Sequence, residues 1–339
     1  MAELTTSWLG MTLASPLVVG ASPLTHDVEA VATAVANGAG AVVMHSLFEE
    51  QVLHEQLSAR HFLSSPDGSA EEAEPLPVSA DELVHGAEPY LRQLDRLRKR
   101  VTVPIVASLN GVTPGGWTDF ARACEVHGAD AIELNLYDVV TSAADSGRSV
   151  EDRQLAIVES VANTVALPLT VKISPYYTSV PSFVEQLSEA GADGVTLFNR
   201  FYQPDVDVDQ LSVDRRLSFS TSRELPLRLH ALAILSPETD LDLACTGGIH
   251  SGQDAAKALL CGAHVMQCVS ALLEHGPAFI GRVLGELHTW LRTAGYASSN
   301  EARGVLTLAG ARDAVAWERL NYIRILDGWQ PRNARHGAT

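Results

Sequence analysis

The stretch LDLACTGGIHSGQDAAKALLCGAHVMQC, residues 241–268, carries the clearest indication of the fold. It begins with a short apolar run, passes through two adjacent glycines into an alanine-rich segment, and ends with a second apolar run. Continuous apolar strands joined by a helix are typical of a parallel β-sheet that helices cover. This stretch therefore predicts a strand, a helix and a second strand of one parallel sheet.

The same pattern recurs along the rest of the chain. Apolar runs alternate with alanine-rich amphipathic stretches, and the eight runs are PLVVG (16–20), AVVM (41–44), PIVAS (104–108), AIEL (131–134), LTVKI (169–173), GVTLF (194–198), LDLAC (241–245) and HVMQC (264–268). An open doubly wound sheet has about five or six strands, whereas a (β/α)₈ barrel has eight. The count predicts an α/β fold of the (β/α)₈ TIM-barrel type, with the doubly wound sheet as the alternative.

Two of the repeating units are longer than the others, which predicts long βα loops after the second and sixth strands. The excess residues are 45–88 and 199–224, on the face where barrel active sites lie, so both are candidate lids. Within the first, the acidic stretch 64–82 is expected to be flexible. The strand pattern resumes after it, so we expect one domain over residues 1–339, with 297–339 as a C-terminal appendage.

Composition narrows the class of function. The chain of 339 residues has 24 Lys and Arg against 41 Asp and Glu, a net charge of −17, which disfavours nucleic-acid and anionic-membrane partners. No apolar stretch approaches the roughly 20 residues of a membrane span, and the first residues lack a signal-peptide pattern, so a cytoplasmic location is expected. The four cysteines form no CxxC pair, and no metal site is expected. A small-molecule enzyme fits these features best.

The glycines of the opening stretch predict a phosphate site. Gly247 and Gly248 directly follow a strand, where glycine lets the backbone approach a ligand, and Ser251 can cap the next helix. Barrels frequently bind phosphate with the loops after strands seven and eight, which adds the backbone around Ser270 and Ala271. A tight turn without a ligand is the alternative.

Four other residues carry polar groups at strand ends. Lys172 lies within the fifth run, where a lysine either points into the barrel mouth or is buried unpaired at high cost. Asn135 and Asn199 close the fourth and sixth strands, and their amides suit the edges of a planar ring, although either could be only a cap. His45 follows the second strand and is either a ligand or a structural histidine.

Together these motifs resemble a known family. The segments ELNLYD (133–138), TVKISPYY (170–177), TLFNRF (196–201), TGGIHSGQDAAKALLCGA (246–263) and MQCVSALLEHGP (266–277) are similar to the soluble, FMN-dependent dihydroorotate dehydrogenases, and most of all to their dehydrogenase-like relatives. The resemblance runs from residue 16 to about residue 296. It implies an FMN cofactor, a homodimer and a place in pyrimidine biosynthesis.

The resemblance also assigns residues. Those it places around the flavin are Ala21, Ser22, His45, Asn110, Asn135, Lys172, Gly247, Gly248, Val269, Ser270 and Ala271. Those it places around the substrate are His45, Asn135 and Asn199. It puts Lys172 at the N1/C2 edge of the isoalloxazine, where a cation favours the anionic reduced flavin and so assists catalysis.

Three positions depart from the family pattern. Asp138 stands where the family has its catalytic cysteine, His45 replaces a lysine that touches flavin and orotate, and the family's substrate loop has no counterpart in 46–88. The resemblance therefore makes Asp138 or Tyr137 the catalytic base. An exposed aspartate, with a pKa of about 3.9, would need burial or a nearby carboxylate to serve well.

These observations predict an FMN-dependent oxidoreductase that acts on a CH–CH bond next to a carbonyl, in dihydroorotate or a related dihydropyrimidine. The electron acceptor stays open, and a partner redox protein is one candidate. One alternative is a flavin-binding electron-relay or regulatory subunit without its own substrate turnover. The other is an aldolase or lyase in which Lys172 forms a Schiff base.

Overall fold

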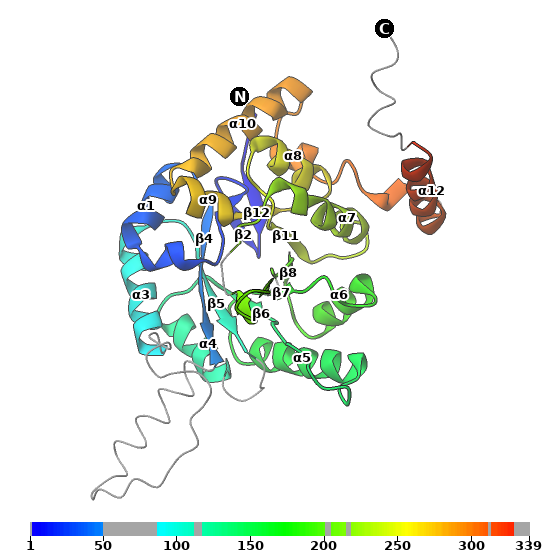
Figure 1. Ribbon diagram of the computed structural model, residues 1–339. Coiled ribbons are helices and arrows are strands. Elements are labelled where there is room, and N and C mark those ends of the chain that lie inside the picture. The colour runs from blue at the N-terminus through cyan, green and yellow to red at the C-terminus, as the bar shows by residue number, and fades with distance from the viewer. Residues whose placement is uncertain are drawn as a thin grey trace, which may run out of the picture.

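The computed structural model describes residues 2–49, 87–111, 117–200, 205–214, 218–310 and 313–328. Its centre is a closed barrel of parallel strands in the order β11-β12-β3-β4-β5-β6-β7-β8, which confirms the predicted TIM barrel (Figure 1). The strands are β3 (Leu17–Val19), β4 (Ala41–Phe48), β5 (Ile105–Asn110), β6 (Ala131–Asn135), β7 (Leu169–Ile173), β8 (Gly194–Leu197), β11 (Asp242–Thr246) and β12 (Val265–Cys268). All eight predicted runs are strands of this barrel.

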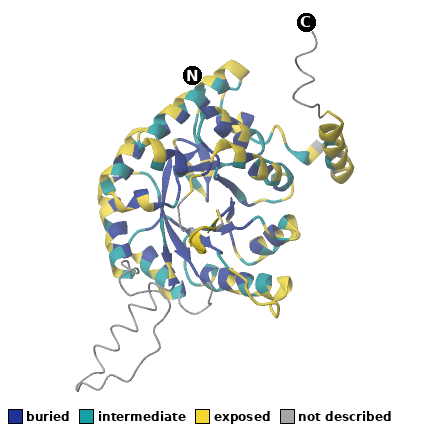
Figure 2. Cartoon of the chain, in the orientation of Figure 1, coloured by how far each residue is buried: buried dark blue, intermediate teal, exposed yellow. Residues whose placement is uncertain are grey.

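Helices surround the barrel and bury their apolar faces against it, as Figure 2 shows by the dark blue residues between the two layers. They are α1 (Val28–Ala36), α3 (Ala87–Arg100), α4 (Trp117–Val126), α5 (Gly147–Ala162), α6 (Val180–Glu189), α7 (Leu225–Leu235), α8 (Gly252–Leu260), α9 (Ser270–His275) and α10 (Phe279–Ala294). In α10 the buried residues Ile280, Val283, Leu287 and Leu291 recur at helical spacing. This spacing gives one apolar stripe that faces the barrel.

Alternate residues of each strand point to opposite sides of the barrel wall. Outward residues such as Val42 and Met44 join the core between strands and helices, whereas Val18 and Val43 belong to a separate apolar cluster inside the barrel. Trp8 joins this inner cluster from a hairpin of β1 (Thr6–Trp8) and β2 (Met11–Leu13), which precedes the first barrel strand. The hairpin closes the N-terminal end of the barrel, and its three-residue strands were not predicted.

The remaining elements follow the barrel strands or its last helix. A hairpin of β9 (Asp205–Asp207) and β10 (Ser212–Asp214) lies in the predicted second lid. The short helices are η1 (Pro23–His26), η3 (Ser222–Glu224), η4 (Leu308–Gly310) and α11 (Ser299–Ala302). The last helix, α12 (Ala314–Asp327), lies outside the ring of barrel helices in Figure 1, and its Glu318 is 3.4 Å from His230 of α7. The acidic stretch 64–82 lies outside the described residues. Within the described part of the chain, no helix has the length and apolarity to cross a membrane.

Candidate active site

The inner side of the barrel changes from apolar to polar toward the C-terminal ends of the strands. Val106 and Ala131 belong to the inner apolar cluster, and two residues further along the same strands lie Ser108 and Glu133. The buried polar residues that face inward at this level are Ser108, Glu133, Thr170, Lys172, Thr196 and Gln267. The sequence alternation thus places a polar layer beneath the barrel mouth, where active sites of this fold lie.

Glu133 is the centre of this layer. It has no exposed surface, and its carboxylate accepts hydrogen bonds from Gln267 Nε2 at 2.6 Å and Thr196 Oγ1 at 3.2 Å. Lys172 Nζ lies 3.5 Å from the same carboxylate, so the buried ammonium is paired. The sequence reasoning found Lys172 and missed Glu133 and Gln267. A carboxylate inside an otherwise apolar strand run was the signal that could have found Glu133.

The asparagines predicted to bind a planar ring lie together at the mouth. Asn199 Nδ2 donates to Asn135 Oδ1 at 2.6 Å, and both residues are buried. Asn135 pairs with Asn110 on one side and with Lys172 on the other in the strand ladder. The structure therefore brings four predicted site residues from four neighbouring strands to one place.

His45 does not join this group, because a β-bulge in β4 turns it away. Val43 pairs with Val106 and Ser46 pairs with Ser108, so two residues of β4 lie opposite one residue of β5. The His45 amide donates to Thr25 Oγ1 at 2.7 Å, and its ring lies 3.8 Å from the His26 ring, centroid to centroid.

These contacts lie outside the barrel wall. The His45 ring also packs against Tyr90 of α3, and together with Arg92 and Arg96 it lines a cavity of about 480 Å³. Ser46 takes the inward position instead, and its hydroxyl lies 2.8 Å from that of Ser108. A role for His45 toward flavin or substrate stays a prediction, and the structure gives the place beside Ser108 to Ser46.

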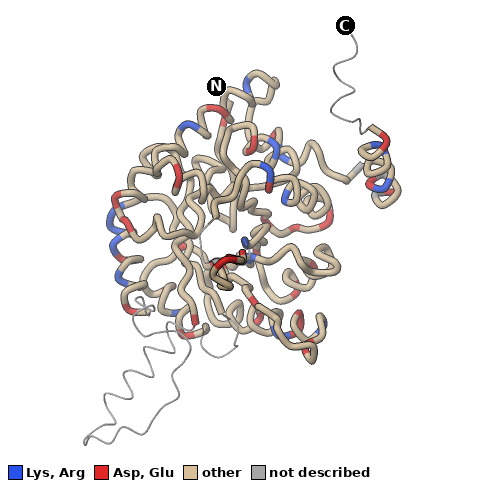
Figure 3. The backbone as a smooth tube through the Cα atoms, viewed as in Figure 1, with Lys and Arg blue, Asp and Glu red and all other residues tan. Residues whose placement is uncertain are grey.

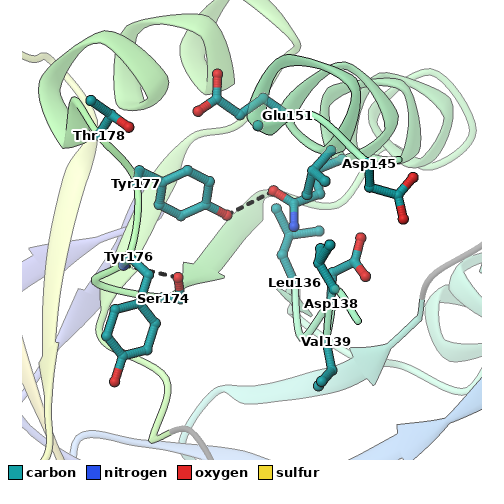
Figure 4. A pocket seen from close by; sticks show the side chains of 13 residues that line it. Leu136, Asp138, Val139, Asp145, Glu151, Ser174, Tyr176, Tyr177 and Thr178 are labelled. Carbon is teal, nitrogen blue, oxygen red and sulfur yellow. Dashed lines mark hydrogen bonds between the residues drawn. The ribbon is translucent and has the colours of Figure 1, made fainter. Parts of the chain in front are cut away.

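Asp138 lies beside a second cavity, of about 430 Å³, between the loops that follow β6 and β7. Figure 4 shows its carboxylate on the opposite wall from Tyr176 and Tyr177. Arg153 of α5 donates to Asp138 Oδ2 at 2.5 Å, a partner that the sequence reasoning missed. Asn135, Lys172 and Asn199 do not line this cavity, so the structure places Asp138 to one side of the polar layer.

The neighbours of Asp138 include the half-buried Tyr177. The Tyr177 hydroxyl donates to Gln154 Oε1 at 2.7 Å, and burial raises the pKa of this phenol above its usual value. Tyr137, the second candidate base, is half-buried, and its amide donates to the Asn135 carbonyl at 3.1 Å. The two candidate bases lie two and three residues after Asn135, on the loop that joins β6 to α5.

The predicted phosphate loop has the backbone geometry that glycine requires. Gly247 and Gly248 have φ angles of +89° and +88°, and a Cβ on Gly248 would lie 2.8 Å from the Leu225 amide nitrogen. The Gly248 amide donates to Ser220 Oγ at 3.4 Å, and Ser220 Oγ donates to Ser270 Oγ at 2.9 Å. Ser220 comes from the loop before α7 and was not predicted.

The other predicted phosphate and flavin residues lie at the same end of the barrel. Ser251 caps α8 by accepting from the Asp254 amide, and the Asp254 carboxylate accepts from the His250 amide, so this helix start already holds a carboxylate. Ala21 and Ser22 directly follow β3. Val269 Cγ2 would lie 2.5 Å from a Cβ on Gly20, and the chain continues from there to the buried Ala271.

The charges outside the site are of both signs. Figure 3 shows acidic and basic residues on the helices that surround the barrel, with basic residues gathered on α3, where Arg98 pairs with Asp130 and Arg100 with Glu29. The net charge of the chain is −17, so acidic residues predominate over it as a whole. This distribution agrees with a small-molecule substrate.

Comparison with known proteins shows which family this chain matches. The family model described as dihydroorotate dehydrogenase matches residues 83–291. A dihydroorotate dehydrogenase B (NAD(+)) catalytic subunit of Thermoplasma acidophilum is 23% identical over 313 residues, which cover 90% of this chain and 99% of that protein. The corresponding subunit of Methanothermobacter thermautotrophicus is 26% identical over 228 residues, 65% of this chain and 74% of that protein. The NAD-dependent dihydropyrimidine dehydrogenase subunit PreA of Escherichia coli is 25% identical over 325 residues, 89% of this chain and 76% of that protein.

Proposed function

This chain belongs to the dihydroorotate dehydrogenase family, and from that premise we propose that it is an FMN-dependent enzyme that oxidises dihydroorotate or a related dihydropyrimidine. It is an oxidoreductase that acts on a CH–CH bond, and proteins of this family bind a flavin. The observation that carries the proposal is the convergence of Asn110, Asn135, Lys172 and Asn199 at a barrel mouth beside a glycine loop. A bound FMN would supply the acceptor for the hydride that leaves the CH–CH bond.

The residues present fit FMN on three grounds. A Cβ on Gly248 would collide with the Leu225 backbone at the start of α7, so only glycine lets this loop pass so close to that helix, and the Gly248 amide is a donor suited to a phosphate. The amides of Asn110 and Asn135 offer donors and acceptors to a flavin ring. Gln267 Oε1 is buried and has no hydrogen-bond partner among the described residues, which leaves one acceptor for a ligand donor.

Lys172 is proposed to act through its charge. The ammonium sits in a nearly buried position, where a charge acts more strongly than in water. Glu133 accepts from it and is itself fixed by Gln267 and Thr196, so the ammonium is held in place before any ligand binds. A fixed cation at the edge of the flavin would favour the electron-rich form of the ring.

Substrate binding is assigned to Asn135 and Asn199. Their mutual hydrogen bond holds the Asn135 amide oxygen and the Asn199 amide NH2 in place. The Asn135 NH2 and the Asn199 oxygen can then pair with the carbonyl and NH edges of a dihydropyrimidine. Uncharged groups of this kind recognise a planar ring by position and need no ionic partner.

We assign removal of the substrate's proton to Asp138 or Tyr137, as the resemblance implies. In the present arrangement Arg153 occupies one carboxylate oxygen of Asp138, which leaves the other oxygen to take a proton. The loop between β6 and α5 carries both candidates, so a shift of this loop would move them together. Asp138→Asn and Tyr137→Phe distinguish the two candidate bases.

The partners follow from the reaction and from the relatives. Two relatives are described as catalytic subunits, which supports a redox partner protein as the electron acceptor of this chain. We also propose a homodimer and a cytoplasmic location, both as expected from the sequence. The substrate is a small molecule.

One alternative has an observation in its favour. An electron-relay or regulatory subunit would keep the flavin site and lose the base, and the ion pair between Arg153 and Asp138 draws that carboxylate toward α5. The Schiff-base alternative is weaker, because such chemistry needs a neutral amine and Lys172 is paired with Glu133.

Anaerobic reduction tests the proposal. Purified protein loaded with FMN is mixed with dihydroorotate, dihydrouracil or dihydrothymine, and the visible flavin absorption is followed. We expect at least one of these compounds to bleach it. A protein that binds FMN and is bleached by dithionite but by none of the three compounds would be the relay subunit, and the assignment of substrate would be wrong.

A further inference from the structure

Arg228 of α7 is a buried cation with an unused donor. Only 5% of the residue is exposed. Its Nε donates to the Thr246 carbonyl at 3.0 Å, and its Nη1 donates to the Glu224 carbonyl at 2.8 Å. Among the described residues, Nη2 has no acceptor, and no carboxylate forms an ion pair with the guanidinium.

A buried charge without an ionic partner is costly, and native proteins rarely keep one. The two carbonyls satisfy hydrogen bonds but carry no net charge. Burial lowers the pKa of the Arg228 guanidinium below its usual value, although arginine stays charged at neutral pH. The nearby Glu224 carboxylate lies 3.4 Å from Arg200, so it is shared with another cation. The site around Arg228 therefore favours an additional anion.

The guanidinium lies directly against the glycine loop. A Cβ built on Gly247 would lie 2.9 Å from Arg228 Nη2 and 3.2 Å from Cζ. Thr246, whose carbonyl Arg228 binds, is the last residue of β11 and directly precedes this glycine. Arg228 thus joins α7 to the end of β11 and packs against the loop.

The other polar groups of this loop are neutral. The Gly248 amide and the hydroxyls of Ser220 and Ser270 form one connected group. Such groups can donate hydrogen bonds to a phosphate, but they cannot balance its charge of about −1.5 to −2 at pH 7. A cation is needed for that, and Arg228 is placed to supply it.

We propose that Arg228 balances the charge of the FMN phosphate at the Gly247–Gly248 loop and holds this loop in its binding shape. The inference rests on the proposed function, because the flavin phosphate is the anion concerned. Hydrogen bonds to two backbone carbonyls already fix the guanidinium, so its side chain loses little conformational entropy when the phosphate binds. Arg228 is therefore a binding and positioning residue of the phosphate end, remote from the reacting bond.

Riboflavin, which is FMN without the phosphate, separates this role from a general structural one. FMN and riboflavin are titrated into the apo-form of the full chain, for the parent and for Arg228→Gln, by quenching of flavin fluorescence. We expect the Kd of FMN to rise roughly 10- to 100-fold, as for the loss of a charged hydrogen-bonding partner, and the Kd of riboflavin to change by less than about twofold. An equal loss for both flavins, or no loss for FMN, would overturn the proposal.

Arg100→Gln is the matched control, because it removes the same charge from an exposed residue that pairs with Glu29. It should change neither Kd. If Arg228→Gln fails to fold, Arg228→Lys is titrated instead, and its preference for FMN over riboflavin should be smaller than in the parent; an unchanged preference contradicts the proposal. A parent that binds neither flavin would refute the proposed function itself, a result distinct from equal losses in the variant.

Discussion

Glu133 accepts hydrogen bonds from side chains of three other strands and has no contact with solvent. A buried carboxylate without partners would shed its charge or destabilise the fold, so the pair with Lys172 is what allows both charges inside the barrel. The same pair holds the ammonium at the mouth, where we propose that Lys172 faces the edge of the flavin. Under this proposal, stability and cofactor binding depend on the same contact.

The pair predicts strong coupling in a double-mutant cycle. Lys172→Met leaves the Glu133 charge buried and unpaired, which should lower the free energy of unfolding by about 3 kcal/mol. Adding Glu133→Gln removes the orphaned charge, so the double variant should recover at least about 1 kcal/mol of that loss. Urea unfolding of the apo-proteins measures both values. Losses that simply add would mean that the 3.5 Å contact does not couple the two side chains.

Asp138 gives a second prediction at this scale. If it is the base, Asp138→Asn should slow flavin reduction by substrate about 10²–10⁴-fold in a stopped-flow experiment, the usual worth of a positioned base. Arg153→Gln is its control, because it removes the same ion pair and keeps the carboxylate, and it should retain most of the rate. Tyr137→Phe makes the complementary test. If both Asp138→Asn and Tyr137→Phe reduce the flavin at the parent rate, neither residue is the base and another group takes the proton.

The bulge in β4 determines which side chain of that strand faces the site. One extra residue between Val43 and Ser46 makes Ser46, instead of His45, the next residue that faces inward. Side chains outside the strand bind the backbone amides that the interrupted ladder leaves unpaired. The Tyr90 hydroxyl accepts from the Ser108 amide at 2.8 Å, and Thr25 Oγ1 accepts from the His45 amide. The bulge is thus fixed from outside by η1 and α3.

Two substitutions in β4 test this arrangement. His45→Leu should lower the free energy of unfolding by about 1 kcal/mol and change the Kd of FMN by less than about twofold, because the ring packs outside the barrel. Ser46→Val should weaken FMN or substrate binding by about tenfold, because it removes a hydroxyl beside Ser108 at the mouth. Flavin titration and urea unfolding measure both. The reverse pattern would restore His45 as the ligand.

The sequence predicted the elements better than their details, for physical reasons. Apolar runs such as 169–173 mark buried parallel strands, because both sides of such a strand are covered. The hairpin β1–β2 was not predicted, because strands of three residues are too short to show a periodic pattern. The bulge was not predicted, because register depends on the partner strand. Arg153 and Ser220 escaped because their contacts join distant segments and leave no local pattern.

At the scale of the whole molecule, the closed barrel brings together groups that are far apart in the chain. Ser46 and Gln267 lie far apart in the sequence, and both face the inside of the barrel. The phosphate loop belongs to β11 and the candidate base to the loop after β6, so one barrel end can hold the two ends of a flavin and a substrate ring. No single sequence motif contains this site, because its residues lie together only when the barrel is closed.

The proposed function requires one FMN at this barrel mouth, and the flavin content of the purified protein decides whether it is present. The protein is denatured, and the released flavin is identified and quantified against protein concentration, alongside a Gly248→Asp variant that places a carboxylate at the loop. We expect one noncovalent FMN per chain, a melting temperature that rises when FMN is added to apo-protein, and loss of both in Gly248→Asp. A protein that releases no flavin and gains no thermal stability from added FMN would contradict it.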